Sequence, residues 1–109
     1  MAGINKRKKG NIWQNICRKQ LIREGYYAID NFKLNVFTHR FEKSAFPDLI
    51  AVKNGVPFAF ECKAMKSFPK SDVLGLNNLK NAYGFRAAFL YPKYGVNSNK
   101  KDNLIIRWV

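Results

Sequence analysis

Two carboxylates and a lysine lie close together in the middle of the sequence. Asp48 follows Pro47 at the start of one apolar run, and Glu61 and Lys63 close the next apolar run. Mg²⁺ prefers oxygen ligands, and it typically takes one or two carboxylates together with water and phosphate oxygens. A neighbouring lysine can activate a water or stabilise charge that develops on phosphorus. These residue types together suit the metal-dependent cleavage of a phosphodiester bond.

Asn54 and Gly55, between the two runs, predict a two-residue hairpin turn. Counting outward from this turn along both strands brings Asp48 directly opposite Glu61. Opposed residues share a face of the hairpin, with Cβ atoms roughly 5 Å apart. Lys63 points to the same face because it lies two residues beyond Glu61. Like charges in this position destabilise a strand pair, so we expect a compensating cation.

The alternative is an ordinary surface strand, since an isolated Glu-x-Lys triplet is common by chance. The register across the turn favours a functional site. On this register Cys62 points to the opposite face, which Phe58 and Phe60 make apolar. Cys17 and Cys62 lack metal-ligand spacing and do not form a disulfide framework, so both are expected in the core of a protein in a reducing compartment.

The chain is strongly basic, with 20 Lys and Arg residues against 7 Asp and Glu residues and a net charge of +13. Such an excess of positive charge indicates an anionic binding partner, and nucleic acid is favoured over an anionic membrane surface. No apolar run approaches the length of a membrane span. The basic N-terminus has no apolar stretch behind it, which argues against a secretory signal. We therefore expect a cytoplasmic, DNA-associated protein with no membrane partner.

A chain of 109 residues with 47% hydrophobic residues predicts a single folded domain, residues 1–109. Residues 1–9 are expected to form a basic, flexible N-terminal arm, which either binds phosphates or is a solvated tail. The polar stretch 38–44 is expected to form a loop over the site. The expected elements are a helix over 11–24 capped by Asn11, strands near 26–29 and 32–37, hairpin strands over 48–52 and 56–63, a helix from a Ser71-Asp72 cap to residue 83, and strands over 85–91 and 104–109.

Helical periodicity between residues 11 and 24 predicts one apolar stripe, and the other elements suit a layered domain. The stripe comprises Ile12, Trp13, Ile16, Cys17 and Leu21. Helices that flank a mixed central β-sheet in an α/β (α+β) domain are the natural architecture for this order of elements.

The residues above resemble those of the PD-(D/E)xK nuclease superfamily, and within it those of the small Holliday junction resolvases of the archaeal and RecU types. The resemblance covers nearly the whole chain. It is carried by Lys9-Gly10 before an amphipathic helix, by Asp48 with Glu61-Cys62-Lys63, and by the segment 66–91, where a Ser-Phe-Pro loop leads into a helix and a core strand. The stand-alone VRR-type nuclease domains are another similar branch. The resemblance implies a restriction-endonuclease-like fold with the order α-β-β-β-α-β(-β).

The resemblance also implies a role for each matching residue. Asp48, Glu61 and the backbone carbonyl of Cys62 would bind Mg²⁺ or Mn²⁺, and Lys63 would orient or activate the attacking water. The expected activity is that of a Mg²⁺-dependent endodeoxyribonuclease, most favoured at four-way (Holliday) junctions. Resolvases of this kind act as homodimers, so a homodimer is expected here, with Phe37, Phe41 and Phe68 as candidates for its interface.

Two positions depart from the family pattern. The archaeal resolvases have a glutamate on the first helix where this chain has Gln14, and the related branches have a glutamine on the second helix where it has Asn77. Gln14 is either an uncharged part of the catalytic site or a solvated helix residue. Without a charge there, metal affinity should be weaker, unless Glu24 or Glu42 substitutes.

Two alternatives remain open. One is a nuclease of the same fold that acts on other DNA structures in repair or in the replication of a mobile element. The other is a non-catalytic DNA-binding module that kept the fold, which Gln14 and Asn77 favour. In each case basic side chains would contact phosphates, and the candidates are Lys8, Lys9, Arg18, Arg40, Lys66 and Lys70.

Overall fold

The computed structural model describes residues 2–42 and 46–109, with side chains from residue 11 onward. Helix α1 covers Ala2–Arg23 and helix α2 covers Lys70–Tyr83. The strands are β1 Tyr27–Asp30, β2 Lys33–Asn35, β3 Arg40–Glu42, β4 Leu49–Lys53, β5 Val56–Cys62, β6 Arg86–Pro92 and β7 Leu104–Trp108.

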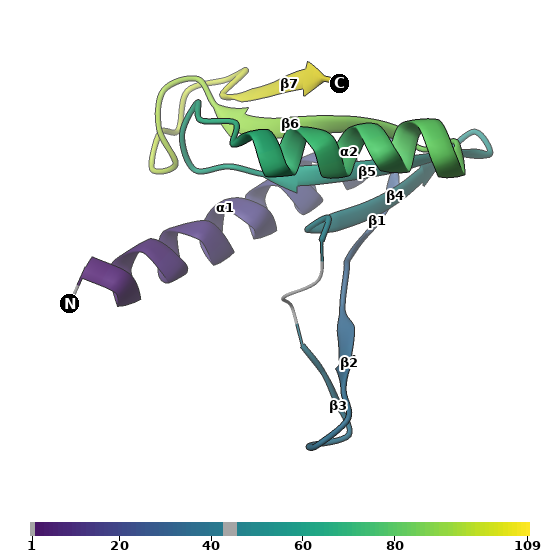
Figure 1. Cartoon of the computed structure of the whole chain (residues 1–109). Helices are drawn as coiled ribbons and strands as arrows, with labels where there is room; N and C mark the ends of the chain where they lie inside the picture. Colours follow the sequence, from purple (N-terminus) through teal and green to yellow (C-terminus); the bar gives the residue numbers. More distant parts are fainter. Residues whose placement is uncertain (1, 43–45) are drawn as a thin grey trace.

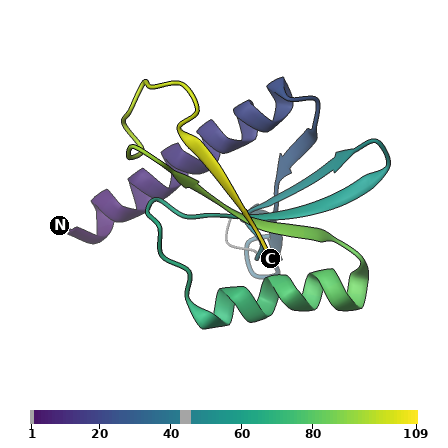
Figure 2. The same cartoon turned by 90° about the horizontal axis from the view of Figure 1, so that it is seen from above.

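Within these described residues, five strands form one sheet in the order β1-β4-β5-β6-β7. The β5–β6 pair is parallel and the other three pairs are antiparallel, so the sheet is mixed as predicted. Helix α2 makes the crossover between the two parallel strands, as parallel pairing requires. Figures 1 and 2 show α1 and α2 on opposite faces of this sheet.

Strand β5 alternates between two apolar cores. Phe58 and Phe60 pack with Trp13 of α1 on one face, while Ala59 packs with Leu76 of α2 on the other. Successive residues of a strand point to opposite faces, so one strand can be buried on both sides. The expectation that Cys17 and Cys62 belong to the core is confirmed, because both pack in the cluster beneath α1.

The predicted register of the β4–β5 hairpin is confirmed. Leu49 pairs with Phe60, and the pairing continues to the residues that flank the turn. Asn54 and Gly55 have φ angles of 54° and 77°. A turn with both central residues in the left-handed region matches the twist of the flanking strands, which is why Asn-Gly favours it.

Helix α1 begins at Ala2, nine positions before the predicted start at Asn11. Residues 2–9, expected as an arm, are therefore helical in the structure. The apolar stripe is also narrower than predicted, because Ile12 and Ile16 are 42% and 36% exposed while Trp13, Cys17 and Leu21 are buried. The three buried residues recur at every fourth position, which is the spacing of a single helix face.

The prediction that residues 38–44 form a loop over the site is wrong for residues 38–42, which the structure describes. Strands β2 and β3 pair with each other in antiparallel fashion and form a separate ribbon. Figure 1 shows this ribbon standing away from the sheet. Residues 43 and 44 of the predicted loop lie outside the described residues.

Helix α2 begins at Lys70, with Pro69 as its N-cap and with no side-chain hydrogen bond to the cap. The predicted Ser71-Asp72 cap is therefore wrong, and both residues lie in the first turn. The predicted end is confirmed, because Gly84 closes the helix with a φ of 75°. Proline suits this N-terminal position because the first turn leaves its N–H groups without helical partners in any case.

Candidate active site

Asp48 and Glu61 come together at the open end of the β4–β5 hairpin. Asp48 lies one residue before β4, and the Leu49–Phe60 pairing continued by one step places it opposite Glu61. The Asp48 Oδ2 atom accepts a hydrogen bond of 2.9 Å from the Cys62 N–H, and the two carboxyl groups share a hydrogen bond. The hairpin turn thus brings together two acids that are thirteen positions apart in the chain.

Glu61 is only 7% exposed. Burial raises the pKa of Glu61 to about 9, with further contributions from its hydrogen bond to Asp48 and from the negative charge of Asp48. The positive charge of Lys63 lowers it, but not enough to offset these effects. At neutral pH the pair of carboxyl groups therefore holds a proton unless another cation takes its place.

Cys62 presents its backbone and its side chain to different surroundings. The Cys62 N–H points toward Asp48. Because the N–H and C=O of one strand residue point to the same side, the Cys62 carbonyl also points toward the open end of the hairpin. Its thiol packs on the other face, where a hydrogen bond with Cys17 and burial raise the pKa of the Cys62 thiol well above its usual range. The thiol thus stays protonated and unsuited to bind a metal, while the carbonyl is directed toward the site.

The oxygen donors at the open end of the hairpin fit a hard divalent cation. Two carboxylates and a backbone carbonyl are oxygen ligands of the kind that Mg²⁺ and Mn²⁺ favour. Among the residues that the structure describes, no three His, Cys, Asp or Glu side chains gather closely enough to hold a metal ion. A cation here would therefore depend on Asp48, Glu61 and the Cys62 carbonyl, with its remaining ligands from solvent or substrate.

Lys63 follows β5 directly and forms an ion pair with Asp72, a residue that sequence reasoning did not assign to the site. Asp72 lies in the first turn of α2. Its position after a proline and a serine indicated a helix cap, and this local signal concealed the contact with Lys63. The site therefore has a third acidic group, attached to the lysine and contributed by the second helix.

Gln14 is buried beneath the site, so it is not a solvated helix residue. Its Nε2 donates to the Asp30 carboxylate at 3.0 Å and to the backbone carbonyl of Asp48 at 3.3 Å. It therefore touches the backbone of Asp48 and not the carboxylate. Asn31 reaches the same segment, since its N–H donates to the Asp48 carbonyl at 2.9 Å. These contacts fix the chain where it enters β4.

Asp30 is the second acidic residue that sequence reasoning missed. It ends β1, which pairs with β4, and it is bound by Gln14. An acid just after the predicted strand 26–29 was the available signal, but its neighbours depend on strand pairing. Glu24 and Glu42 do not substitute for an acid on α1, because Glu24 bonds with Gln20 at the end of that helix and Glu42 with Asn35 in the ribbon.

The predicted phosphate contacts fall into separate regions. Lys66 is exposed on the segment between Lys63 and α2, and Lys70 is exposed at the first position of α2. Arg40 is exposed on the ribbon. Arg18 turns inward, with its Nε 3.9 Å from Asp30, so it pairs with an acid of the site region. The side chains of Lys8 and Lys9 lie outside the described ones.

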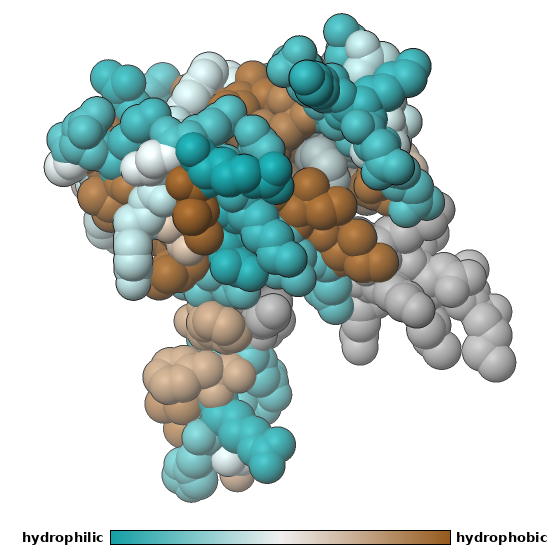
Figure 3. Space-filling model, turned by 180° about the vertical axis from the view of Figure 1, so that it is seen from behind, coloured by the Kyte–Doolittle hydropathy of each residue, from teal (hydrophilic) through white to brown (hydrophobic). Residues whose placement is uncertain are grey.

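The ribbon carries exposed apolar side chains together with basic ones. Figure 3 shows it as a finger that projects from the body and bears both brown and teal residues. The large apolar side chains exposed there are Leu34, Val36, Phe37 and Phe41, and Phe37 is 95% exposed. Phe68, the third aromatic considered for an interface, instead packs on Phe89 and Tyr91 inside the body.

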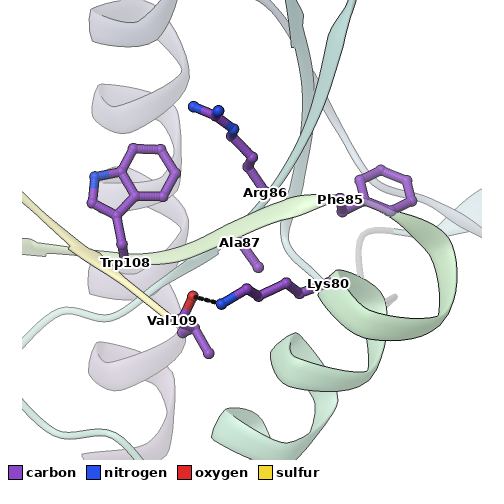
Figure 4. Close-up of a pocket in the computed structure, with 6 residues that line it drawn as sticks. All are labelled: Lys80, Phe85, Arg86, Ala87, Trp108 and Val109. Carbon is purple, nitrogen blue, oxygen red and sulfur yellow. Dashed lines mark hydrogen bonds between the residues drawn. The ribbon is translucent and has the colours of Figure 1, made fainter.

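An open pocket of about 310 Å³ lies at the other end of β6 from this site (Figure 4). Its lining residues are Lys80, Phe85, Arg86, Ala87, Trp108 and Val109. Arg86 pairs with Phe58 near the start of β5, whereas Leu90 pairs with Cys62 at its end. The pocket is therefore separate from the carboxylate pair. Figure 4 also shows Lys80 Nζ donating to the Val109 carbonyl, at 3.1 Å.

No family model matches this sequence, and a search of curated proteins finds no similar sequence. Among the helices of residues 2–42 and 46–109, none is long and apolar enough to cross a membrane. The fold, however, is similar to that of Hjc, a Holliday junction resolvase from the archaeal hyperthermophile Archaeoglobus fulgidus. The TM-score is 0.56 at 15% sequence identity, over 92% of this chain and 87% of that protein. The chain therefore has a fold like that of this archaeal resolvase, and the expected restriction-endonuclease-like fold is confirmed.

Proposed function

We propose that this protein is a metal-dependent DNA endonuclease that hydrolyses phosphodiester bonds at four-way junctions. The observation that carries the proposal is the contact between the half-buried Asp48 and the buried Glu61, with Lys63 next to them, in a fold like that of a junction resolvase. A buried pair of carboxyl groups in contact is costly unless a proton or a cation neutralises it. A site that binds a cation explains why the chain places both acids there.

Each residue has a distinct task in this proposal. Asp48, Glu61 and the Cys62 carbonyl hold Mg²⁺ or Mn²⁺, which when bound polarises the scissile phosphate and stabilises the leaving oxygen. Lys63 presents its ammonium group to the attacking water and to the charge that develops on phosphorus. Gln14 holds the backbone of Asp48 in place and does not contact the reacting atoms.

The charge and the fold support DNA as the substrate. A net charge of +13 suits DNA phosphates, and the chain has no recognised motif for reading bases, so recognition by DNA shape is favoured. A homodimer would place two sites on two strands of a symmetric junction. Such a protein would act in recombination and repair, together with the DNA inside the cell.

The decisive experiment is a nicking assay on a labelled four-way junction with Mg²⁺. The wild-type protein should nick paired strands, and Asp48→Asn and Lys63→Ala should each lose activity by about 10²-fold or more, as expected for groups that act on transition-state charge. Glu24→Gln is a matched control, because it removes one negative charge from an exposed residue just after α1, which bonds with Gln20. If both site variants cut at the wild-type rate, the assignment of Asp48 and Lys63 to the active site is wrong.

The same junction, a flap and a linear duplex, assayed side by side, test the substrate. Preference for the flap or the duplex would favour the alternative of a nuclease of this fold in repair or in mobile-element replication. The non-catalytic alternative, which Gln14 and Asn77 favour, predicts that calorimetry with Mn²⁺ on the protein alone detects no binding that depends on Glu61.

A further inference from the structure

Among the described residues, the Lys63 ammonium pairs with one acid, Asp72 of helix α2. Lys63 Nζ donates to Asp72 Oδ2, and the two side chains are 24% and 21% exposed. The backbone of Lys63 is fixed, since its N–H donates to the Leu90 carbonyl at 2.8 Å. Four rotatable bonds separate that backbone from the ammonium group, so the strand alone does not determine where the charge lies. The contact with Asp72 determines the position of the ammonium group.

Asp72 is well placed to hold a cation. It lies in the first turn of α2, where the helix dipole favours a negative charge, and its N–H bonds to the Pro69 carbonyl at 3.0 Å. One turn farther along, Leu76 is fully buried against the sheet. The carboxylate therefore projects from a rigid helix that packs on the same sheet as β5.

The same helix also touches the segment that leads into Asp48. A Cβ atom added to Gly75 would lie 2.7 Å from the Phe46 ring, so the ring rests directly on the backbone of α2. Phe46 is two residues before Asp48. The charge of Asp72 also reaches the carboxyl pair, where it is one of the contributions that raise the pKa of Glu61. Helix α2 thus contacts the approach to one acid and the lysine beside the other.

We propose that Asp72 is a positioning residue, which holds the Lys63 ammonium on the face of the carboxyl pair where the scissile phosphate would bind. The inference rests on the proposed nuclease function and deepens it. Asp72 touches neither the metal ligands nor the substrate in this account, and it acts through Lys63. Its removal should lower the rate of bond cleavage and leave the affinity for DNA nearly unchanged.

The test compares Asp72→Asn, Asp72→Ala and Asp72→Glu in single-turnover cleavage of a four-way junction at saturating protein. A misplaced catalytic group commonly costs about 10²-fold in rate, so Asp72→Ala and Asp72→Asn should cut roughly 10 to 100 times more slowly. Asp72→Glu keeps the charge and should recover part of the loss. The junction affinity of all three variants, measured in Ca²⁺, should match that of wild type. Glu24→Gln, which removes one charge from an exposed helix end, should cut normally.

A double-mutant cycle shows whether Asp72 acts through Lys63. In a Lys63→Ala background, Asp72→Asn should cause no further loss, because coupled residues give non-additive effects. Additive losses would overturn the inference, as would a cutting rate of Asp72→Asn equal to that of wild type. Melting temperatures of each variant show that the fold is kept. A wild-type protein that does not cut would overturn the proposed function as well, whereas an active wild type with a fully active Asp72→Asn variant would overturn this inference alone.

Discussion

Glu61 is a carboxyl group whose usual protonation state is reversed by its surroundings. Burial and the neighbouring Asp48 raise its pKa to about 9, against an ordinary value of 4.5. The folded, metal-free protein therefore binds a proton that the unfolded chain releases at neutral pH. A divalent cation competes for the same oxygens, so the proton and the metal exclude each other.

This shift predicts how the stability of the metal-free protein depends on pH. Because the folded-state pKa is the higher one, the stability from the bound proton is complete below about 4.5 and is lost as the pH rises toward 9. Thermal melts in EDTA should show a falling melting temperature across this window, and Glu61→Gln should flatten the trend. Mn²⁺ should restore the melting temperature of the wild type at pH 8 and not that of Glu61→Gln. A wild-type profile no steeper than that of the variant would contradict the assignment.

Gln14 gives a second prediction for a single residue. An ionised glutamate in its place would lose both hydrogen-bond donors and would face the Asp30 carboxylate. Gln14→Glu should therefore lower the free energy of unfolding by about 1–3 kcal/mol, the usual cost of unsatisfied buried groups. Asp30→Asn added to Gln14→Glu restores a donor opposite the new acid and should recover much of the loss. Urea denaturation measures both effects. Equal stability of wild type and Gln14→Glu would show that these hydrogen bonds are not important.

At the scale of elements, the β4–β5 hairpin sets the geometry of the site through its turn. Gly55 has a φ of 77°, in the region where side chains other than glycine are strained. Gly55→Ala should lower the free energy of unfolding by roughly 1–2 kcal/mol, the cost of a left-handed residue with a Cβ. Nothing lies within 4 Å of the added Cβ, so backbone strain is the only cause. Lys53→Arg, which leaves the turn backbone unchanged and keeps a cation at the Tyr26 ring, serves as a control. Urea denaturation that finds the two variants equally stable would contradict this account of the turn.

Local chemistry explains which elements could be predicted. The hairpin register followed from two turn residues, and the end of α2 followed from Gly84, because both signals lie within a few residues. The start of α1 could not be predicted, since its first nine residues are mostly polar, basic or glycine and have no helical apolar period. The alternation in residues 32–37 indicated a strand but not its partner, and β2 pairs outside the main sheet.

In the candidate site, too, local signals could be predicted and tertiary contacts could not. Asp48, Glu61 and Lys63 could be placed from sequence because one hairpin carries all three. Asp30 joins them only through the β1–β4 pairing, and Asp72 only through the crossover helix. Both contacts depend on tertiary structure, and a local cap pattern even pointed to a different role for Asp72.

At the scale of the whole molecule, a net charge of +13 should dominate the affinity for DNA. Each phosphate contact releases counterions, so a protein with 6–10 such contacts loses about 10³- to 10⁵-fold in affinity between 50 and 200 mM salt. Fluorescence anisotropy of a junction titrated with protein at several salt concentrations measures this slope. Arg40→Gln and Lys66→Gln should each reduce the slope by about 1. A flat salt dependence would argue against phosphate contacts, and an unchanged slope would exclude that residue from them.

The hydrogen bond from the Cys62 N–H to Asp48 Oδ2 gives the molecule a natural spectroscopic reporter. The NMR resonance of an amide proton that donates to a carboxyl group is sensitive to the charge on that group. In a ¹⁵N-labelled sample without DNA, the Cys62 cross-peak should move as Mg²⁺ is added and as the carboxyl pair loses its proton. The cross-peak of Ala59, on the same strand but beside Leu76, should stay in place. One backbone amide can thus report the state of the centre without any cleavage assay.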